Sequence, residues 1–314
     1  MSAGPAEVGV LLMAYGTPAR PSDVEAFYTD VRRGRPPTPE QLADLQRRYD
    51  AVGGISQLAA RTAEQVAGVQ SALEAVSPGT FSCRFGSKHA SPSIEHTVSS
   101  FATDGIERFV ALVLAPHYSV GSVGEYLARA TAAAAAHGIS VGAIEDWHDH
   151  PVLIEMLAER VLAAYSAIGS EPSDPGVELL VTAHSLPVRI IEGGDTYDRR
   201  LQETAGLVVA ATGAARWRVC WQSAGRTPEP WLGPDVLDVL RGLPVAGLSG
   251  AVVCPAGFTS DHLEVSYDLD IEASALAVGL GLRFARTASL NADSRLCAAL
   301  AGLVLSAVPE VTRR

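Results

Sequence analysis

Three carboxylates spaced four residues apart are the first feature of this sequence that could carry chemistry. Glu264, Asp268 and Glu272 share one face if residues 261–273 form a helix. Like charges at this spacing repel each other by about 0.2–0.5 kcal/mol per pair on an exposed helix, and no Lys or Arg occurs between residues 242 and 282. Because divalent cations such as Mg²⁺ and Ca²⁺ prefer oxygen ligands, the pattern indicates a hydrated cation. The alternative is a solvated acidic first turn, which a helix N-terminus also favours.

Two further side chains follow apolar runs and suit proton or metal chemistry. His184 comes after the run 177–182, and Tyr15 occupies the equivalent place after the run 7–13. An imidazole with an ordinary pKa near 6.5 can accept a proton or bind a metal at neutral pH. Tyr15 can serve as an aromatic wall, a hydrogen-bond donor or a weak oxygen ligand. The alternatives are a structural histidine and a tyrosine that only packs.

A basic segment stands out in an acidic protein. Five arginines fall within the 17 residues from Arg32 to Arg48. Guanidinium groups match carboxylates in a fork geometry, so the segment predicts a bound anion. A solvated basic surface is the alternative. Ser56, which follows two glycines, is predicted to cap a helix over residues 57–76.

Four short apolar runs predict buried strands and form two similar pairs. Runs 7–13 and 109–114 lead into Ala-Tyr-Gly-Thr-Pro and Ala-Pro-His-Tyr-Ser, and runs 177–182 and 250–253 lead into Ala-His-Ser-Leu-Pro and Cys-Pro-Ala-Gly-Phe. Such runs, alternating with helical segments, indicate parallel strands covered by helices on both faces. The predicted helices are 39–49, 56–76, 92–104, 123–136, 151–168, 197–212, 261–273 and 294–308. The predicted fold class is α/β, with two doubly wound, Rossmann-like domains related by internal duplication.

We expect these domains to span residues 1–149 and 150–314, with a last helix that can pack across the seam. In open parallel sheets, ligands bind beyond the carboxyl ends of the strands. Tyr15, His117, His184 and the turn 257–264 all fall at such ends. A cleft between the two domains would bring them face to face.

Composition excludes several classes of protein. Apolar residues make up 47% and charged residues 19% of the 314 residues, which is typical of a globular chain. The net charge of −11 argues against nucleic acid and anionic membranes as partners. The N-terminus lacks the pattern of a signal peptide. The four cysteines show no paired spacing, and Cys220 and Cys254 lie in apolar runs, so we expect a reduced, cytoplasmic setting.

Taken together, these segments resemble ferrochelatases, most closely the soluble bacterial type that inserts iron into coproporphyrin. The likeness covers nearly the whole chain, and several motifs occur in order. They are Leu-Leu-Met-Ala-Tyr-Gly-Thr-Pro from Leu11, Gly-Gly-Ile-Ser from Gly53, Lys88-His89, Leu-Ala-Pro-His-Tyr-Ser from Leu114, Ala-His-Ser-Leu-Pro from Ala183, Trp-Leu-Gly-Pro-Asp from Trp231 and Asp-His-Leu-Glu-Val from Asp261. The resemblance implies two Rossmann-like halves around a porphyrin cleft.

The resemblance also implies roles for individual residues. His184 and Glu264 match the catalytic pair of metal insertion, and both match metal ligands. Asp268 and Glu272 match an acidic metal path that can hold a second hydrated divalent cation. Tyr15 matches the residue that faces the porphyrin metal from the other side. The positions that match the rim or the propionates of the substrate are Arg32, Arg33, Arg48, Ser56 and Tyr126. The resemblance gives Lys88 and His89 no derivable role.

The activity implied is insertion of Fe(II) into coproporphyrin III in haem biosynthesis, with loss of two pyrrole protons. The implied partners are coproporphyrin III and Fe(II), an upstream porphyrin-forming oxidase and a downstream coproheme decarboxylase. We expect a monomer with no tightly bound cofactor, no nucleic acid partner and no membrane insertion. Some relatives hold an iron–sulfur cluster on C-terminal cysteines, but no cysteine follows Cys297, so we expect no cluster.

Other activities stay open on the sequence alone. The substrate could instead be protoporphyrin IX or sirohydrochlorin. The basic segment replaces the apolar lip of membrane-associated relatives, which favours a substrate with four carboxylates. A protein of a different class, such as a tetrapyrrole or metal carrier without turnover or a two-domain periplasmic metal-binding protein, is the remaining alternative.

Overall fold

The structure is a computed structural model that describes residues 7–312, with the side chains of residues 7–308. Contacts between residues divide the chain into two compact units. Unit 1 contains the described residues up to Ala115, then Gly121–Asp146 and those from Asn291 onward. Unit 2 contains Pro116–Val120 and Trp147–Leu290.

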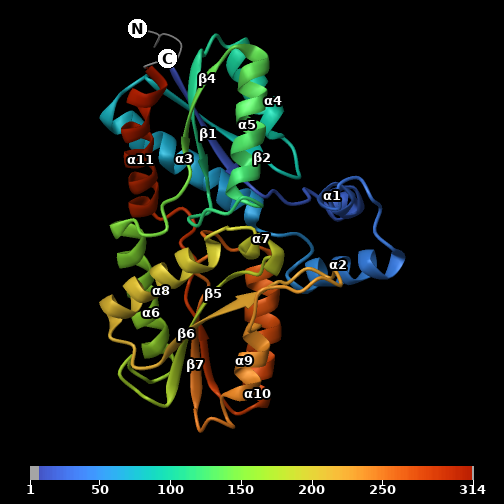
Figure 1. Ribbon diagram of the computed structural model, residues 1–314, viewed down its shortest axis with the longest axis vertical. Coiled ribbons are helices and arrows are strands. Elements are labelled where there is room, and N and C mark those ends of the chain that lie inside the picture. The colour runs from blue at the N-terminus through green and yellow to red at the C-terminus, as the bar shows by residue number, and fades with distance from the viewer. Residues whose placement is uncertain (1–6, 313–314) are drawn as a thin grey trace. The chain divides into compact units, whose positions relative to one another are not determined.

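Unit 1 is a parallel sheet with helices on both faces (Figure 1). Its strand order is β2-β1-β3-β4. Helices α3 and α11 cover one face, and α4 and α5 cover the other, whereas α1 and α2 pack on each other in a separate excursion after β1. The elements are β1 (Val8–Ala14), η1 (Pro21–Asp23), α1 (Val24–Val31), α2 (Pro39–Ala51), α3 (Leu58–Val76), β2 (Phe81–Ser87), α4 (Ile94–Thr103), β3 (Arg108–Val113), α5 (Val123–His137), β4 (Ser140–Ile144) and α11 (Ser294–Thr312).

Unit 2 repeats this plan with the order β6-β5-β7-β8, again fully parallel. Helices α6 and α8 pack on each other and on the sheet, and α9, η2 and α10 form a second packed group (Figure 1). The elements are α6 (Pro151–Ala167), β5 (Val177–His184), α7 (Val188–Glu192), α8 (Tyr197–Thr212), β6 (Trp217–Gln222), α9 (Val236–Gly242), β7 (Gly250–Cys254), η2 (Val265–Ala273), α10 (Ser274–Gly279) and β8 (Arg283–Arg286).

The central strands explain why the sequence folds this way. In β1, Val10 to Met13 are fully buried, and β5 and β7 are equally buried along most of their length. A strand covered on both faces by helices has no polar face, so it appears in the sequence as a continuous apolar run. The predicted α/β class, the four predicted strands and the predicted helices other than 261–273 are confirmed within a few residues.

The units do not correspond to two continuous segments. The predicted boundary after residue 149 lies close to the crossing between Asp146 and Trp147. However, α11 packs against α3, β3 and β4, so the final segment of the second predicted domain belongs to unit 1. The short segment Pro116–Val120 belongs to unit 2, where Ser119 Oγ donates a 2.9 Å hydrogen bond to Asp195.

A search of the described helices for one long and apolar enough to cross a membrane finds none.

Candidate functional site

The carboxyl ends of the unit 2 strands gather polar side chains. His184 is the last residue of β5, and Gln222 is the last residue of β6 beside it. On the other side, the loop after β7 approaches β5 so closely that a Cβ on Gly257 would lie 2.4 Å from the Cβ of Ala183. Only glycine fits there. This approach brings the segment that follows Gly257 toward the end of β5.

His184 and Glu264 face each other at this edge of the sheet. Nε2 of His184 lies 3.5 Å from Oε1 of Glu264, and about a third of each side chain is exposed, 35% and 34%. The other ring nitrogen of His184, Nδ1, donates a 2.5 Å hydrogen bond to the carbonyl of Ser185. That bond fixes the ring so that Nε2 points to the carboxylate.

The pair is ionised at neutral pH. Burial on its own lowers the pKa of His184, but the Glu264 carboxylate outweighs it and raises the pKa to about 9. Burial likewise favours the neutral acid at Glu264, yet His184 and His262 hold the pKa of Glu264 well below its usual range. An imidazolium therefore faces a carboxylate, and a proton is already present where protons could be exchanged.

A second imidazole flanks the same carboxylate. Nε2 of His262 lies 3.6 Å from Oε2 of Glu264, and its Nδ1 donates to the carbonyl of Ser260 at 3.1 Å. The ring of Phe258 packs against His262 with centroids 4.6 Å apart. The sequence prediction missed His262, although its place two residues before Glu264 was visible as a signal.

The acidic segment is helical, but its central part is not an α-helix. Val265–Ala273 is a π-helix, η2, with i→i+5 hydrogen bonds, between short stretches of α-helix. The prediction of a regular helix over 261–273 was wrong in this respect, because residue spacing cannot tell the two hydrogen-bonding patterns apart. Stretches of π-helix are rare and occur often at functional sites.

The three carboxylates of this segment differ in environment. Glu264 and Glu272 are half-buried, whereas Asp268 is 7% exposed and accepts a 2.5 Å hydrogen bond from Ser223 Oγ. Ser223 holds a left-handed backbone with φ of 60° right after β6. Strained positions of this kind concentrate at functional sites.

A positive charge near the acidic segment comes from outside residues 242–282, which contain no Lys or Arg. Arg286 on β8 forms a bidentate pair with Asp270, at 2.7 and 2.9 Å, and lies 3.4 Å from Asp261. Arg286 therefore neutralises Asp261 and Asp270, which are close in sequence to the three carboxylates. Among the described residues, no three His, Cys, Asp or Glu side chains converge tightly enough to form a ready metal site. His184, Glu264, Asp268 and Glu272, which the sequence predicts as metal ligands, thus do not converge into a closed site in the described structure.

Tyr197 supports His184 from behind. Its hydroxyl donates a 3.2 Å hydrogen bond to the backbone carbonyl of His184, and its ring packs on Trp221 with centroids 5.6 Å apart. Its own backbone N–H donates to Asp195 Oδ1 at 2.9 Å. No local sequence pattern marks Tyr197, because this contact links a strand end to a helix that begins 13 residues later.

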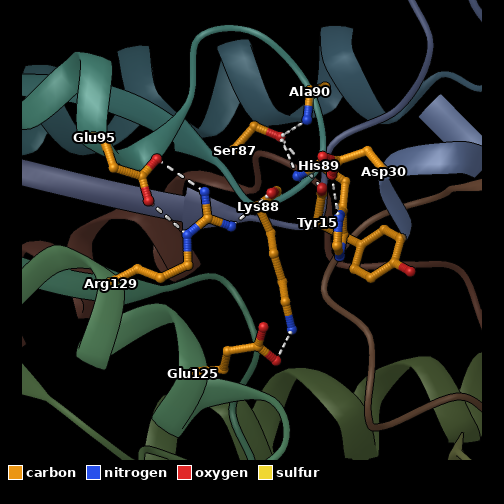
Figure 2. Close-up of polar contacts among 9 residues, drawn as sticks. All are labelled: Tyr15, Asp30, Ser87, Lys88, His89, Ala90, Glu95, Glu125 and Arg129. Atoms are coloured by element: carbon orange, nitrogen blue, oxygen red, sulfur yellow. Dashed lines mark hydrogen bonds and ion pairs between the residues drawn. The ribbon is translucent and has the colours of Figure 1, made fainter. Parts of the chain in front are cut away.

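The equivalent edge of unit 1 carries Tyr15, just beyond β1 (Figure 2). Its side chain is 42% exposed. The ring of His89 meets it edge-on with centroids 4.6 Å apart, and Phe27 of α1 lies 6.3 Å from it. Nδ1 of His89 also contacts Asp30 of α1 at 2.7 Å. The structure thus places Tyr15 in an aromatic cluster at a strand end.

The basic segment follows α1 directly. Arg32 lies with its guanidinium carbon 5.6 Å from the ring centre of Tyr28, and its Nε donates to the carbonyl of Arg35. Arg33 is exposed and has a left-handed backbone with φ of 58°. Arg48 lies on α2, half-buried, with its Nε 3.4 Å from Asp44.

Ser56 and Tyr126 are both buried, at 7% and 4% exposure. Ser56 Oγ accepts a hydrogen bond from the backbone of Leu58 at 3.1 Å, one residue before the cap position of α3. The ammonium of Lys88 lies 5.1 Å from the ring centre of Tyr126. Both residues are packed into unit 1, and their predicted role at the substrate rim stays a prediction.

The four cysteines are free thiols on four different elements. Cys220 and Cys254 are fully buried, as the apolar runs predicted. Burial raises the pKa of Cys83 and of Cys254 to about 12, which disfavours thiolate chemistry. That the protein holds no iron–sulfur cluster stays a prediction, and an assay for acid-labile sulfide would test it.

The sequence of this chain is similar to those of several known proteins. The family model described as ferrochelatase matches residues 7–308. Coproporphyrin III ferrochelatase of Oceanobacillus iheyensis is 42% identical over 301 residues, covering 95% of this chain and 96% of that protein. The protein of the same name from Geobacillus kaustophilus is 44% identical over 300 residues, covering 95% of both chains. That of Bacillus subtilis is 41% identical over 302 residues, covering 95% of this chain and 97% of that protein.

Two solved structures of distant sequence have a similar fold. SirB from Bacillus subtilis with Fe³⁺ has a TM-score of 0.56 at 12% identity, covering 98% of this chain and 96% of that one. CbiX, from siroheme biosynthesis in denitrifying bacteria, has a TM-score of 0.53 at 17% identity, covering 95% of this chain and 99% of that one. At these identities the likeness concerns the fold alone. The family assignment rests on the full-length sequence match, and on that basis this chain belongs to the ferrochelatase family.

Proposed function

We propose that this protein inserts Fe(II) into coproporphyrin III to give coproheme, with release of two pyrrole protons. The observation that carries the proposal is the partly exposed His184–Glu264 pair at the end of β5. The pair belongs to a chain that is 41–44% identical to several proteins named coproporphyrin III ferrochelatase.

The proton chemistry follows from the charges of the pair. Two N–H protons must leave the macrocycle as Fe(II) enters, so the overall charge is conserved. Glu264 is ionised and can accept the first proton. His184 is protonated at rest, because its pKa is raised to about 9, and it becomes the acceptor of the second proton only after its own proton has passed to water.

The metal chemistry follows from the acidic face. Imidazole is a good ligand for iron, whereas carboxylates suit a hydrated cation in transit. Asp268 and Glu272 continue from Glu264 along η2, and we propose that they guide the iron substrate or hold a second divalent cation. Incomplete convergence of these side chains fits a passage, since a tight cage would retain the metal.

The substrate class follows from the arginines. Coproporphyrin III carries four propionates, and protoporphyrin IX carries two propionates and two apolar vinyl groups. We propose that Arg32 and Arg33, and with them Arg48, bind carboxylates at the substrate rim. We further propose that Tyr15, Ser56 and Tyr126 contribute to the same binding. A porphyrin-forming oxidase would supply the substrate, a coproheme decarboxylase would consume the product, and the protein would act as a monomer.

An anaerobic assay of the purified protein tests the proposal. The protein is mixed with Fe(II) and, separately, with coproporphyrin III, protoporphyrin IX or sirohydrochlorin, and metallation is followed by absorbance against a control without protein. We expect efficient turnover with coproporphyrin III. Turnover confined to sirohydrochlorin or protoporphyrin IX would contradict the proposed substrate. Tight binding of every tetrapyrrole without turnover would identify a carrier.

A further inference from the structure

Lys88 is a cation at a strand end whose charge is already used inside the protein. It follows β2 directly, and its side chain is only 9% exposed. Its ammonium lies 2.7 Å from Oε2 of Glu125, in the first turn of α5 (Figure 2). It also lies 5.1 Å from the ring centre of Tyr126. A cation with an ion-pair partner and an aromatic face beneath it is poorly placed to bind a further anion.

The backbone of Lys88 is held as firmly as its side chain. Nη1 of Arg129 on α5 donates a 2.7 Å hydrogen bond to the carbonyl of Lys88. The remaining donors of that guanidinium form a bidentate pair with Glu95 on α4, at 2.7 and 2.9 Å (Figure 2). The backbone N–H of Lys88 donates to the carbonyl of Ala14 at the end of β1. Two helices and a strand therefore meet at this one residue.

The next residue, His89, connects this loop to Tyr15 and to α1. The backbone N–H of His89 donates to the carbonyl of Tyr15 at 3.0 Å, and the His89 ring packs on the Tyr15 ring. Burial lowers the pKa of His89, so the ring is neutral at pH 7 and donates Nδ1–H to Asp30 of α1. Helix α1 leads directly into Arg32.

From this geometry we propose that Lys88 is a positioning residue for porphyrin binding and not a ligand of a substrate carboxylate. Its ion pair with Glu125 fixes the loop of residues 87–90. Through His89, that loop sets the orientation of Tyr15 and the start of the basic segment. The inference rests on the proposed function, which supplies the porphyrin.

A double-mutant cycle separates positioning from direct contact. Lys88→Met, Glu125→Gln and the double variant are compared with the parent for binding of coproporphyrin III without iron, followed by tryptophan or porphyrin fluorescence. If Lys88 acts through Glu125, each single change weakens binding by about fivefold and the double change is no worse than either. If Lys88 bound a propionate, Glu125→Gln would free the ammonium, leaving binding unchanged or tighter. That result would overturn the inference.

Turnover provides a second readout and a matched control. Arg129→Met should raise the KM for coproporphyrin III like Lys88→Met, with kcat within about twofold of the parent, because the change affects binding and not the chemical step. Arg84→Met is the control. The side chain of Arg84 is exposed to a similar extent as that of Arg129, 24% against 29%. Arg84 pairs with Ser100 of α4 and with Asp104, which follows α4, and its interactions within the described part of the chain do not include the loop. It should leave KM unchanged.

The outcomes distinguish the two proposals. Thermal melting first establishes that each variant folds, and Lys88→Arg, which keeps the charge, should recover most of the lost binding. A parent that binds coproporphyrin III and shows the expected cycle without inserting iron would refute the proposed function and support the inference. If the parent inserts iron but Glu125→Gln binds porphyrin as tightly as the parent does, the proposed function is supported and the inference about Lys88 is refuted.

Discussion

The two units have sheets of the same strand order but use the carboxyl edges of these sheets differently. In both, the strand second in the order, β1 or β5, is almost fully buried and lies between two parallel neighbours. At the end of β5, His184 and Glu264 are part-exposed and hold each other's pKa away from the usual range. Beside the end of β1, the cation Lys88, which follows β2, forms an internal ion pair with Glu125. The same scaffold therefore supports exchangeable charges in unit 2 and fixed charges in unit 1.

Removing the imidazole of unit 2 should give the largest effect. His184→Ala takes away a positioned base and metal ligand, and loss of one such group typically reduces the rate by about 10²–10⁴. Porphyrin binding should persist. Anaerobic kinetics and a fluorescence binding assay check both points. If the variant inserts iron at a rate within a few-fold of the parent rate, His184 has no essential part in the mechanism. The proposed contrast between exchangeable charges in unit 2 and fixed charges in unit 1 would then be lost.

The effect of the Glu264 carboxylate on the pKa of His184 can be tested without an activity assay. In metal-free protein, NMR titration of His184 should show a midpoint near pH 9. In Glu264→Gln the midpoint should fall toward or below the ordinary value of about 6.5. The substitution removes the main negative charge that opposes the effect of burial on the imidazole pKa. An unchanged midpoint would show that the carboxylate does not control the imidazole.

The same shift fixes the sign of a pH effect on stability. The folded pKa of His184 lies above the unfolded one, so its contribution to stability is fully present below about pH 6.5. It is lost as the pH rises through about 9. If neutral His184 is the proton acceptor, kcat/KM should rise over the same interval. Chemical denaturation and kinetics over this pH range measure the two effects.

Changing the arginines of unit 1 should have a smaller effect, confined to binding. The Arg32→Ala, Arg33→Ala double variant should raise KM for coproporphyrin III more than for protoporphyrin IX. Charge-assisted contacts contribute about 1.5–3 kcal/mol when shielded and less than about 1 kcal/mol when exposed. Because coproporphyrin III offers two more propionates at an exposed rim, the parent should prefer it over protoporphyrin IX by about tenfold. High salt should erode it. Arg20→Ala, at an exposed arginine paired with Asp23, is the control. Equal efficiency on both porphyrins in the parent would leave the segment as a solvated surface.

The support behind His184 should show the smallest effect. Tyr197→Phe removes the hydroxyl that donates to the His184 carbonyl, and one such hydrogen bond contributes about 0.5–1.5 kcal/mol. We expect kcat to fall about threefold, with KM unchanged. Tyr165→Phe is the matched control, since the buried Tyr165 hydroxyl has no hydrogen-bond partner among the described residues. If both variants behave alike, Tyr197 only fills space.

The sequence revealed the parts of the fold whose signal is local. Strands β1, β3, β5 and β7 appear as apolar runs because neighbours and helices bury them from all sides. The outer strands β2, β4 and β8 were not predicted, because each has one free edge and keeps polar or small residues, such as Ser82 and Arg84 in β2. Where apolar content is interrupted, the pattern no longer distinguishes a strand from a loop.

The site shows the same limit. The proximity of His184 and Glu264 was predicted because the position of His184 at a strand end and the motifs around both residues mark them. Arg286 and Ser223 were not, because each reaches the acidic segment from a distant part of the chain. Burial of Tyr126 beneath Lys88 was equally invisible, since it depends on how a loop packs on a helix. Local spacing identifies reactive groups, whereas their charge partners are set by tertiary packing.

The π-helix also makes the acidic face sensitive to residue count. In an α-helix, residues four apart overshoot one full turn. In η2 each hydrogen bond spans one more residue, so residues four apart fall short of a turn and the line of carboxylates drifts around the axis in the opposite sense. Deleting a single residue within 265–273 would let the segment wind as a regular α-helix, in which Glu272 would follow Glu264 by seven residues, close to two full turns. A change in length would therefore alter the relative direction of these two carboxylates, whereas a substitution that keeps the π-helix would not.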